Sequence, residues 1–237
     1  HIVSIASGKE TAAIVEGTAD IAYPESSAVT SEEILSANKS IEKLSAFFSE
    51  ERGYGYIGIN AETVDIGGEA ASEEFFFLIK ALAAVIAYYK EASVNEYFGR
   101  ETLSTDYPVA DGVKIPEAPE ISGEGETLPY IKPYSLNAEG EVFMATAMTE
   151  EEQLAALKAV CLDYLERAGY TIENGRVTTA PEGGKKSFSL YILGNGEGNH
   201  PLYAAVRKAS DFFTEIGITL EIKDTADPSV IWNEISN

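Results

Sequence analysis

The chain has 237 residues, of which 45% are hydrophobic, and its 17 lysines and arginines face 39 acidic residues, giving a net charge of −22. A chain of this length buries roughly 70% of its unfolded surface, so a substantial hydrophobic core is expected. The negative charge makes nucleic acid and anionic membranes poor partners, because both repel it. One cysteine, Cys161, excludes an internal disulfide, and two histidines, His1 and His200, leave too few ligands for a zinc site of the usual His and Cys type.

The first part of the chain mixes strand-like and helical patterns. Residues 2–21 predict a strand ("IVSIA"), a short helix ("KETAAIVEG") that stops at Gly17, and a second strand ("ADIAY"). Weak helical features follow over residues 24–40. The stretch "GYGYIGIN", residues 53–60, alternates glycine with tyrosine or isoleucine, which is typical of a strand that another backbone or a ligand approaches closely.

A long helix is predicted over residues 72–98, ending at Gly99. Its window from Phe75 to Tyr89 has 14 apolar residues out of 15. A membrane-spanning helix needs about 20 such residues and Lys80 interrupts this one, so the window indicates a helix buried on most of its circumference. Residues 100–148 show no sustained period and five prolines, which predicts an extended excursion with one hairpin.

Regular structure is predicted again from Thr149. "TEEE" is a capping box, in which the Thr149 hydroxyl accepts from the backbone and Glu152 reaches back. The apolar stripe of the helix that follows includes Cys161, which is therefore predicted as a core residue rather than a reactive thiol. Gly169 ends this helix, and the Asn174-Gly175 pair predicts a hairpin turn.

A strand, a glycine-rich loop, a helix and another strand are predicted over residues 187–222. At this length they form a right-handed βαβ unit with parallel strands, so the fold class is α/β or mixed α and β. The loop "GNGEGNH" follows the first strand. Open α/β sheets bind ligands at the carboxyl ends of their strands, which makes this loop a candidate ligand site.

The loop does not carry a nucleotide fingerprint. Gly194 and Gly196 fit the pattern G-x-G-x-x-G, but Asn199 stands at its third glycine, and Glu197 would repel a pyrophosphate. The only other feature that matches the fingerprint is an acidic residue near the end of the next strand, Glu221 or Asp224. What the loop offers is a helix N-terminus beside His200, where a carboxylate could dock. The alternative is that Asn199 or His200 only caps the helix.

Both ends of the chain predict that it is a piece of a larger polypeptide. "HIVSI" begins directly in a strand-like run, and Asp227-Pro228 starts a final helix with apolar residues at Ile231, Trp232 and Ile235. That helix reaches residue 237 in the middle of its apolar stripe.

Five segments in order resemble the extracellular solute-binding proteins of the peptide and nickel group, the capture components of ABC importers. "IVEGTADIA" (14–22) is similar to their "l.sGeiDia", "GYGYIGIN" to "y.yigfN", and residues 75–99 to "vRqAlayAiDreaiv…ffg". "AVCLDYLERAGYTIENGRV" (159–177) resembles "AkaLLaeAGy…dG", and residues 188–222 resemble the segment that follows it. Ile79 replaces the arginine of the third motif.

The resemblance implies a periplasmic-binding-protein-like, type II, two-lobed clamshell that closes on a peptide. Residues 1–50 would complete the first lobe and cross the hinge, and residues 51–237 would form the second large lobe, truncated on its C-terminal side. The tryptophan- and aspartate-containing stretch that anchors the peptide amino group in that family would lie beyond residue 237. The ligand-binding residues would then be those of the loop and of the cleft-edge strand: His200, Asn195, Asn199, Tyr54, Tyr56 and Asn60.

The function implied is reversible capture of oligopeptides, without catalysis, cofactor or metal, for delivery to an ABC permease. The protein would be extracellular, held at the bacterial surface through a lipoprotein signal, or periplasmic, with no membrane insertion of this segment. The alternatives are a carboxylate-based glycoside hydrolase and a sugar-binding domain without peptide specificity, since 39 acids offer many carboxylates. An adhesin-like or scaffolding domain is a further alternative.

Overall fold

A computed structural model describes residues 4–6, 8–24, 27–41, 44–46, 56–61, 63–68, 72–98, 122–123, 126–127, 136–144, 147–194 and 196–236. The fold is mixed α/β, as predicted, and it contains a parallel pair of strands. The elements in chain order are α1 (Glu10–Val15), α2 (Ala28–Ile41), α3 (Glu73–Phe98), β1 (Ser122–Gly123), β2 (Glu126–Thr127), α4 (Glu150–Arg167), β3 (Thr171–Glu173), β4 (Arg176–Thr179), β5 (Ser187–Leu193), α5 (Tyr203–Glu215), β6 (Thr219–Thr225) and α6 (Pro228–Ser236).

The predicted βαβ unit is present as β5, α5 and β6, with the strands parallel and in register from Ser187 opposite Thr219 to Leu193 opposite Thr225. One face of α5 carries apolar residues at helical spacing, among them Val206, Ala209 and Phe213, and these are buried. Amphipathic burial of this face, rather than intrinsic helix propensity, is what stabilises such a helix.

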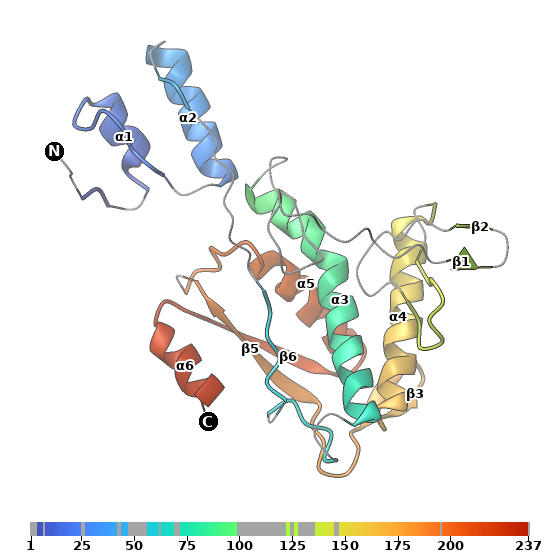
Figure 1. The fold of residues 1–237 in the computed structure, drawn as a ribbon. Helices are drawn as coiled ribbons and strands as arrows, with labels where there is room; N and C mark the ends of the chain where they lie inside the picture. Colours follow the sequence, from blue (N-terminus) through green and yellow to red (C-terminus); the bar gives the residue numbers. More distant parts are fainter. Residues whose placement is uncertain are drawn as a thin grey trace.

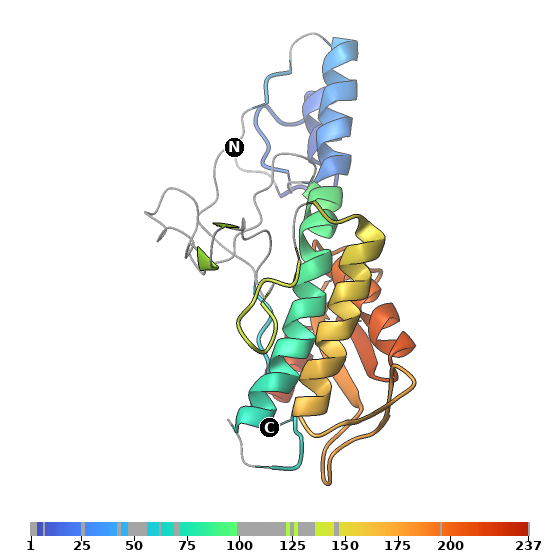
Figure 2. The same ribbon diagram turned by 90° about the vertical axis from the view of Figure 1, so that its right-hand side faces the viewer.

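The core lies where α3, α4 and α5 pack together over the inner faces of β5 and β6. Figures 1 and 2 show α3 and α4 side by side along most of their lengths. Leu78 and Val85 of α3, Leu157 of α4 and Phe213 of α5 have no exposed surface. Cys161 is also fully buried in this cluster, and burial raises the pKa of its thiol, so the prediction of a core cysteine is confirmed.

Several local predictions are confirmed by specific hydrogen bonds and torsions. The Thr149 hydroxyl accepts from the Glu152 N–H at 3.3 Å, while the Glu152 carboxylate accepts from the Thr149 N–H at 2.8 Å, which completes the capping box. Asn174 and Gly175 have φ values of 52° and 73° and join β3 to β4 as an antiparallel hairpin. The Asp227 carboxylate accepts from the Ser229 N–H at 2.9 Å at the start of α6.

The strands predicted near the N-terminus are wrong where the structure describes them. Residues 4–6 and 19–23 form no strand, and only the intervening helix, α1, is present. Ile21 and Tyr23 are 90% and 84% exposed, so their apolar character does not reflect a packed sheet. A strand requires a hydrogen-bonded neighbour, and none pairs with these segments among the described residues. The weak helical pattern that follows is correct and corresponds to α2.

The strand predicted over residues 53–60 is also wrong for its described part, residues 56–60, which run without ladder pairing. The short bridge from Ile66 to Gly184 comes after it. The predicted hairpin within residues 100–148 is present as the antiparallel pair β1 and β2. No helix in the described part of the chain is long and apolar enough to cross a membrane.

Truncation of the buried helix interface tests this arrangement. We expect Leu157→Ala to lower the free energy of unfolding by about 2–5 kcal/mol, because it removes buried methyl groups and leaves a cavity. Leu35→Ala, at a side chain on α2 that is 61% exposed, should change it by less than about 0.5 kcal/mol. Urea denaturation of both variants gives the comparison, and equal effects would contradict the position of the core.

Candidate functional site

The glycine-rich loop folds around a carboxylate of its own neighbouring strand. The Gly198 N–H donates to Asp224 Oδ2 at 2.7 Å, and Asp224 lies on β6 directly opposite Ile192 of β5. A Cβ atom added to Gly194 would lie 2.3 Å from Asp224 Oδ1, so any larger residue at that position would force the carboxylate to move. Asp224 Oδ1 is buried and has no hydrogen-bond partner among the described residues. An anion that is part of the protein therefore already occupies the loop, which disfavours a bound phosphate.

His200 turns the chain from this loop into α5. Its carbonyl accepts from the Tyr203 N–H at 3.0 Å, and its Nδ1 accepts from the Leu202 N–H at 3.2 Å. Burial lowers the pKa of His200 from its usual 6.5, and the charge of Asp224 opposes that shift only in part. An imidazole that accepts at Nδ1 carries its proton at Nε2, so His200 is a neutral group here. This contact satisfies the N–H of Leu202, the N-cap residue of α5, but no side chain caps the first turn of α5, so the capping role that was one alternative from the sequence is not present.

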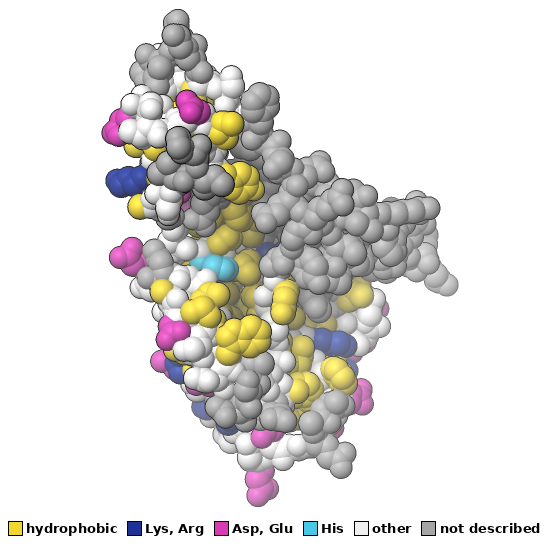
Figure 3. Space-filling view, turned by 60° about the vertical axis from the view of Figure 1, so that its left-hand side comes forward, with side chains coloured by type: hydrophobic (Ala, Val, Ile, Leu, Met, Phe, Trp, Pro, Cys, Tyr) yellow, Lys and Arg dark blue, Asp and Glu magenta, His cyan; other side chains and the backbone are white. Residues whose placement is uncertain are grey.

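A pocket of about 550 Å³ opens beside this histidine. We call it the loop pocket. It lies between the N-terminal helices, the end of α3 and the glycine loop, and Figure 3 shows hydrophobic side chains gathered around the histidine on this side of the molecule. Its lining includes Thr30 and Glu33 of α2, Glu96 and Tyr97 of α3, and Asn199 and His200 of the loop. The volume is within the range of small-molecule sites.

The structure brings together only some of the predicted site residues. His200 and Asn199 both line the loop pocket, whereas Asn195 and Tyr54 lie outside the described residues. Tyr56 is 79% exposed and, like Asn60, does not line that pocket. Sequence reasoning missed the pocket's contributors from distant helices, because no local pattern shows that the end of α3 meets the loop after β5.

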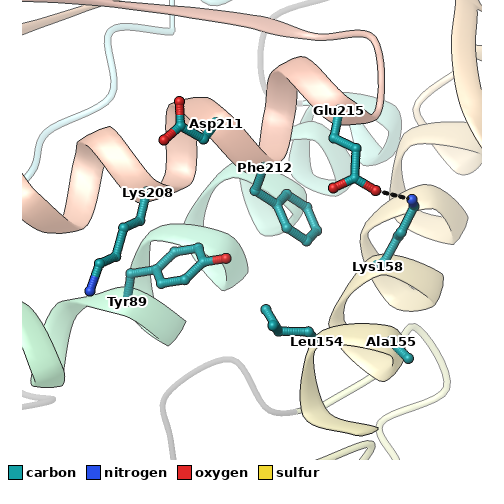
Figure 4. A pocket seen from close by; sticks show the side chains of 8 residues that line it. All are labelled: Tyr89, Leu154, Ala155, Lys158, Lys208, Asp211, Phe212 and Glu215. Atoms are coloured by element: carbon teal, nitrogen blue, oxygen red, sulfur yellow. Dashed lines mark hydrogen bonds and ion pairs between the residues drawn. The ribbon is translucent and has the colours of Figure 1, made fainter. Parts of the chain in front are cut away.

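A second, open groove of about 390 Å³ lies between α3, α4 and α5. In Figure 4, Tyr89, Leu154 and Phe212 form its apolar floor, and Lys158 and Glu215 join across it at 2.5 Å. Both partners of that ion pair are at least a third exposed, and such pairs contribute little to stability. This groove is lined by helices alone and lies away from the glycine loop, so the loop pocket is the better candidate site.

No three histidine, cysteine, aspartate or glutamate side chains in the described ranges are grouped to hold a metal ion. Comparison of the chain with protein-family models, with curated proteins and with solved structures found no match.

The contact between Gly194 and Asp224 can be tested by a double-mutant cycle. Gly194→Ala should destabilise the protein by about 1–3 kcal/mol, because the new methyl group overlaps the carboxylate. In an Asp224→Ala background, most of that cost should disappear. Gly196→Ala is the control: its φ of 79° strains alanine, but no atom lies within 4 Å of a Cβ there, so its cost should be the same in both backgrounds. If Gly194→Ala destabilised the protein equally with and without the Asp224 side chain, the assigned contact would be contradicted.

The state of His200 predicts a pH dependence. Because folding lowers its pKa, the unfolded chain binds the proton more readily. The contribution of neutral His200 to the free energy of unfolding is thus complete above about pH 6.5, and it is lost as the pH falls through the pKa of His200 in the folded protein. His200→Asn keeps an acceptor for the Leu202 N–H but does not titrate. The difference in unfolding free energy between wild type and this variant should shift against the wild type between pH 7.5 and 5.5. A shift in favour of the wild type would mean that Asp224 stabilises the protonated form of His200 more strongly than burial destabilises it.

Proposed function

We propose that this chain is the ligand-binding part of a solute-binding protein that captures oligopeptides reversibly for an ABC importer. The observation that carries the proposal is the loop pocket at the carboxyl end of the parallel strands β5 and β6. Ligands in open α/β folds bind outside the carboxyl ends of strands, next to a helix N-terminus. The pocket has this position, between residues 8–33 on one side and residues 93–97 and 198–204 on the other.

The polar groups of the pocket suit a peptide backbone. Asn199 has an amide that both donates and accepts, His200 has an Nε2–H directed by its backbone contact at Nδ1, and Thr30 has a hydroxyl. Sites that bind a ligand without covalent chemistry are typically lined by apolar side chains, with a few polar groups that fix the orientation of the ligand. An extended peptide can also supply its own backbone hydrogen bonds, which allows varied side chains.

Reversible binding is favoured over covalent catalysis by the state of the candidate nucleophiles. Cys161 is fully buried in the helical core, away from the loop pocket. Ser93 does line the pocket, but its hydroxyl donates to the Tyr89 carbonyl at 2.9 Å rather than to a base. The Nδ1 of His200 is engaged with the backbone. Nucleophilic catalysis needs a hydroxyl or thiol directed at a base, an arrangement that these three residues do not form.

The rest of the proposal comes from the resemblance given by the sequence motifs. In this view the described segment belongs to a two-lobed, periplasmic-binding-protein-like clamshell, with the loop pocket between its parts. The protein would act outside the cell membrane, anchored as a lipoprotein or free in the periplasm, and would deliver its ligand to a membrane permease.

Isothermal titration calorimetry with a panel of di- to pentapeptides tests the proposal, with oligosaccharides of similar mass as the comparison. We expect peptides to bind, and His200→Asn to weaken the binding by about 1–3 kcal/mol, because a polar group of the ligand loses its partner while the turn into α5 keeps its acceptor. Asp211→Asn, in the groove of Figure 4, is the matched control and should leave affinity unchanged. Binding of oligosaccharides but not peptides would overturn the proposal.

A further inference from the structure

His200 ties the glycine loop to the start of α5 through both its backbone and its ring. Its N–H donates to the Gly198 carbonyl at 3.0 Å, and its own carbonyl accepts from the Tyr203 N–H at 3.0 Å. The ring adds a third contact, in which Nδ1 accepts from the Leu202 N–H at 3.2 Å. The backbone groups do not titrate, so of these three contacts only the one made by the ring can respond to a proton.

The ring contact exists only while His200 is neutral. A neutral imidazole has one N–H donor and one acceptor nitrogen, whereas the protonated ring has two donors and no acceptor. A proton at Nδ1 would therefore point an N–H at the N–H of Leu202, and two donors do not form a hydrogen bond. Protonation of His200 breaks this contact, and the ring then needs an acceptor elsewhere.

An acceptor without a partner lies on the other side of the loop. Asp224 uses one carboxylate oxygen, Oδ2, to accept from the Gly198 N–H at 2.7 Å. Its other oxygen, Oδ1, is buried and accepts no hydrogen bond from the described residues. The charge of Asp224 also acts on the titration of His200, so the two side chains lie near each other. A charged N–H donor is the kind of group that best compensates a buried carboxylate oxygen.

The other titratable groups around His200 do not oppose a positive charge on its ring. They line the loop pocket from α1, α2, α3 and the first turn of α5, and the described ones are Glu10, Glu33, Glu96, Tyr97 and Tyr203. No lysine or arginine is among the described lining residues. Burial nevertheless disfavours the charged ring and lowers the pKa of His200 from 6.5, and the charge of Asp224 offsets that effect only in part. The contact at Nδ1 is therefore intact at neutral pH, and its loss requires an acidic solution.

We propose that the glycine loop is an acid-sensitive switch, in which protonation of His200 at Nδ1 breaks its contact with Leu202 and directs the ring to the unpartnered carboxylate oxygen of Asp224. The start of α5 then loses one of its ties to the loop, and the side chain of His200 in the pocket wall changes from a neutral group to a cation. This device goes beyond peptide capture, because it needs only the loop, Asp224 and a proton, whatever ligand the pocket receives.

Nuclear magnetic resonance during a titration from about pH 7.5 to about pH 5 tests the switch, because this range spans the charge change of histidine. The ring nitrogens of His200 report its protonation, and the amide of Leu202 reports the contact with the loop. We expect both signals to change with the same midpoint, below pH 6.5. His1, the other histidine of the chain, gives a second ring signal in the same spectra, and the Leu202 amide should not follow it.

Three variants separate the role of Asp224 from that of general charge. Asp224→Asn keeps an oxygen for the Gly198 N–H but removes the negative charge, so the midpoint of the His200 titration should fall by about 1 pH unit. Glu221→Gln removes the same charge from an exposed side chain on the same strand, β6, and should leave the midpoint unchanged. His200→Asn keeps an acceptor for the Leu202 N–H but does not titrate, and it should abolish the pH response of that amide.

The switch is overturned if the His200 ring titrates while the Leu202 amide stays unchanged, because the ring contact would then survive protonation. It is also overturned if the Leu202 response persists in His200→Asn. Equal falls of the midpoint in Asp224→Asn and Glu221→Gln would exclude Asp224 as the specific partner of the protonated ring. The comparison of the two midpoints needs only the wild-type protein, so it decides the matter even where a variant fails to fold.

Discussion

The parallel pairing of β5 with β6 is the constraint on which the rest of the molecule depends. Two parallel neighbours cannot be joined by a tight turn, so the chain must cross over, and here it does so through α5. The register that places Ile192 opposite Asp224 also brings the Asp224 carboxylate under the glycine loop, where Gly198 donates to it. The loop, the start of α5 and His200 are therefore positioned by one strand register. A shift of one residue would turn Asp224 to the opposite face of the pair.

The helical core extends this constraint to the candidate site. α3 packs against both α4 and α5, and its buried side chains, such as Leu78 and Val85, hold it along the βαβ unit. Because α3 runs from Glu73 to Phe98, its last turns reach the glycine loop, and Glu96 and Tyr97 lie at the pocket although more than 90 residues separate them from His200 in sequence. The site is thus built from helix ends and one loop, and its one buried polar side chain within the described ranges, Ser93, lies on α3 beside the apolar interior.

The parts of the fold that could be predicted from the sequence have local causes. The capping box at Thr149, the Asn174-Gly175 turn and the apolar stripe of α5 each need only neighbouring residues, and the structure has all three. The strands expected over residues 2–6, 19–23 and 53–60 were read from apolar alternation, but a strand forms only with a partner, and alternation does not say whether one exists. For the same reason Asn199 and His200 could be proposed as site residues from their own loop, while Glu33 and Glu96 could not, because their place depends on how distant helices pack.

The claim that the loop pocket receives the ligand is tested most directly by amide hydrogen exchange with and without a pooled tripeptide library. We expect slower exchange on ligand addition at residues 27–33, 93–97 and 198–204, three of the segments that border the pocket, with little change in the groove between α3, α4 and α5. Protection confined to that groove, or no protection at these three segments under conditions where the library binds, would contradict it.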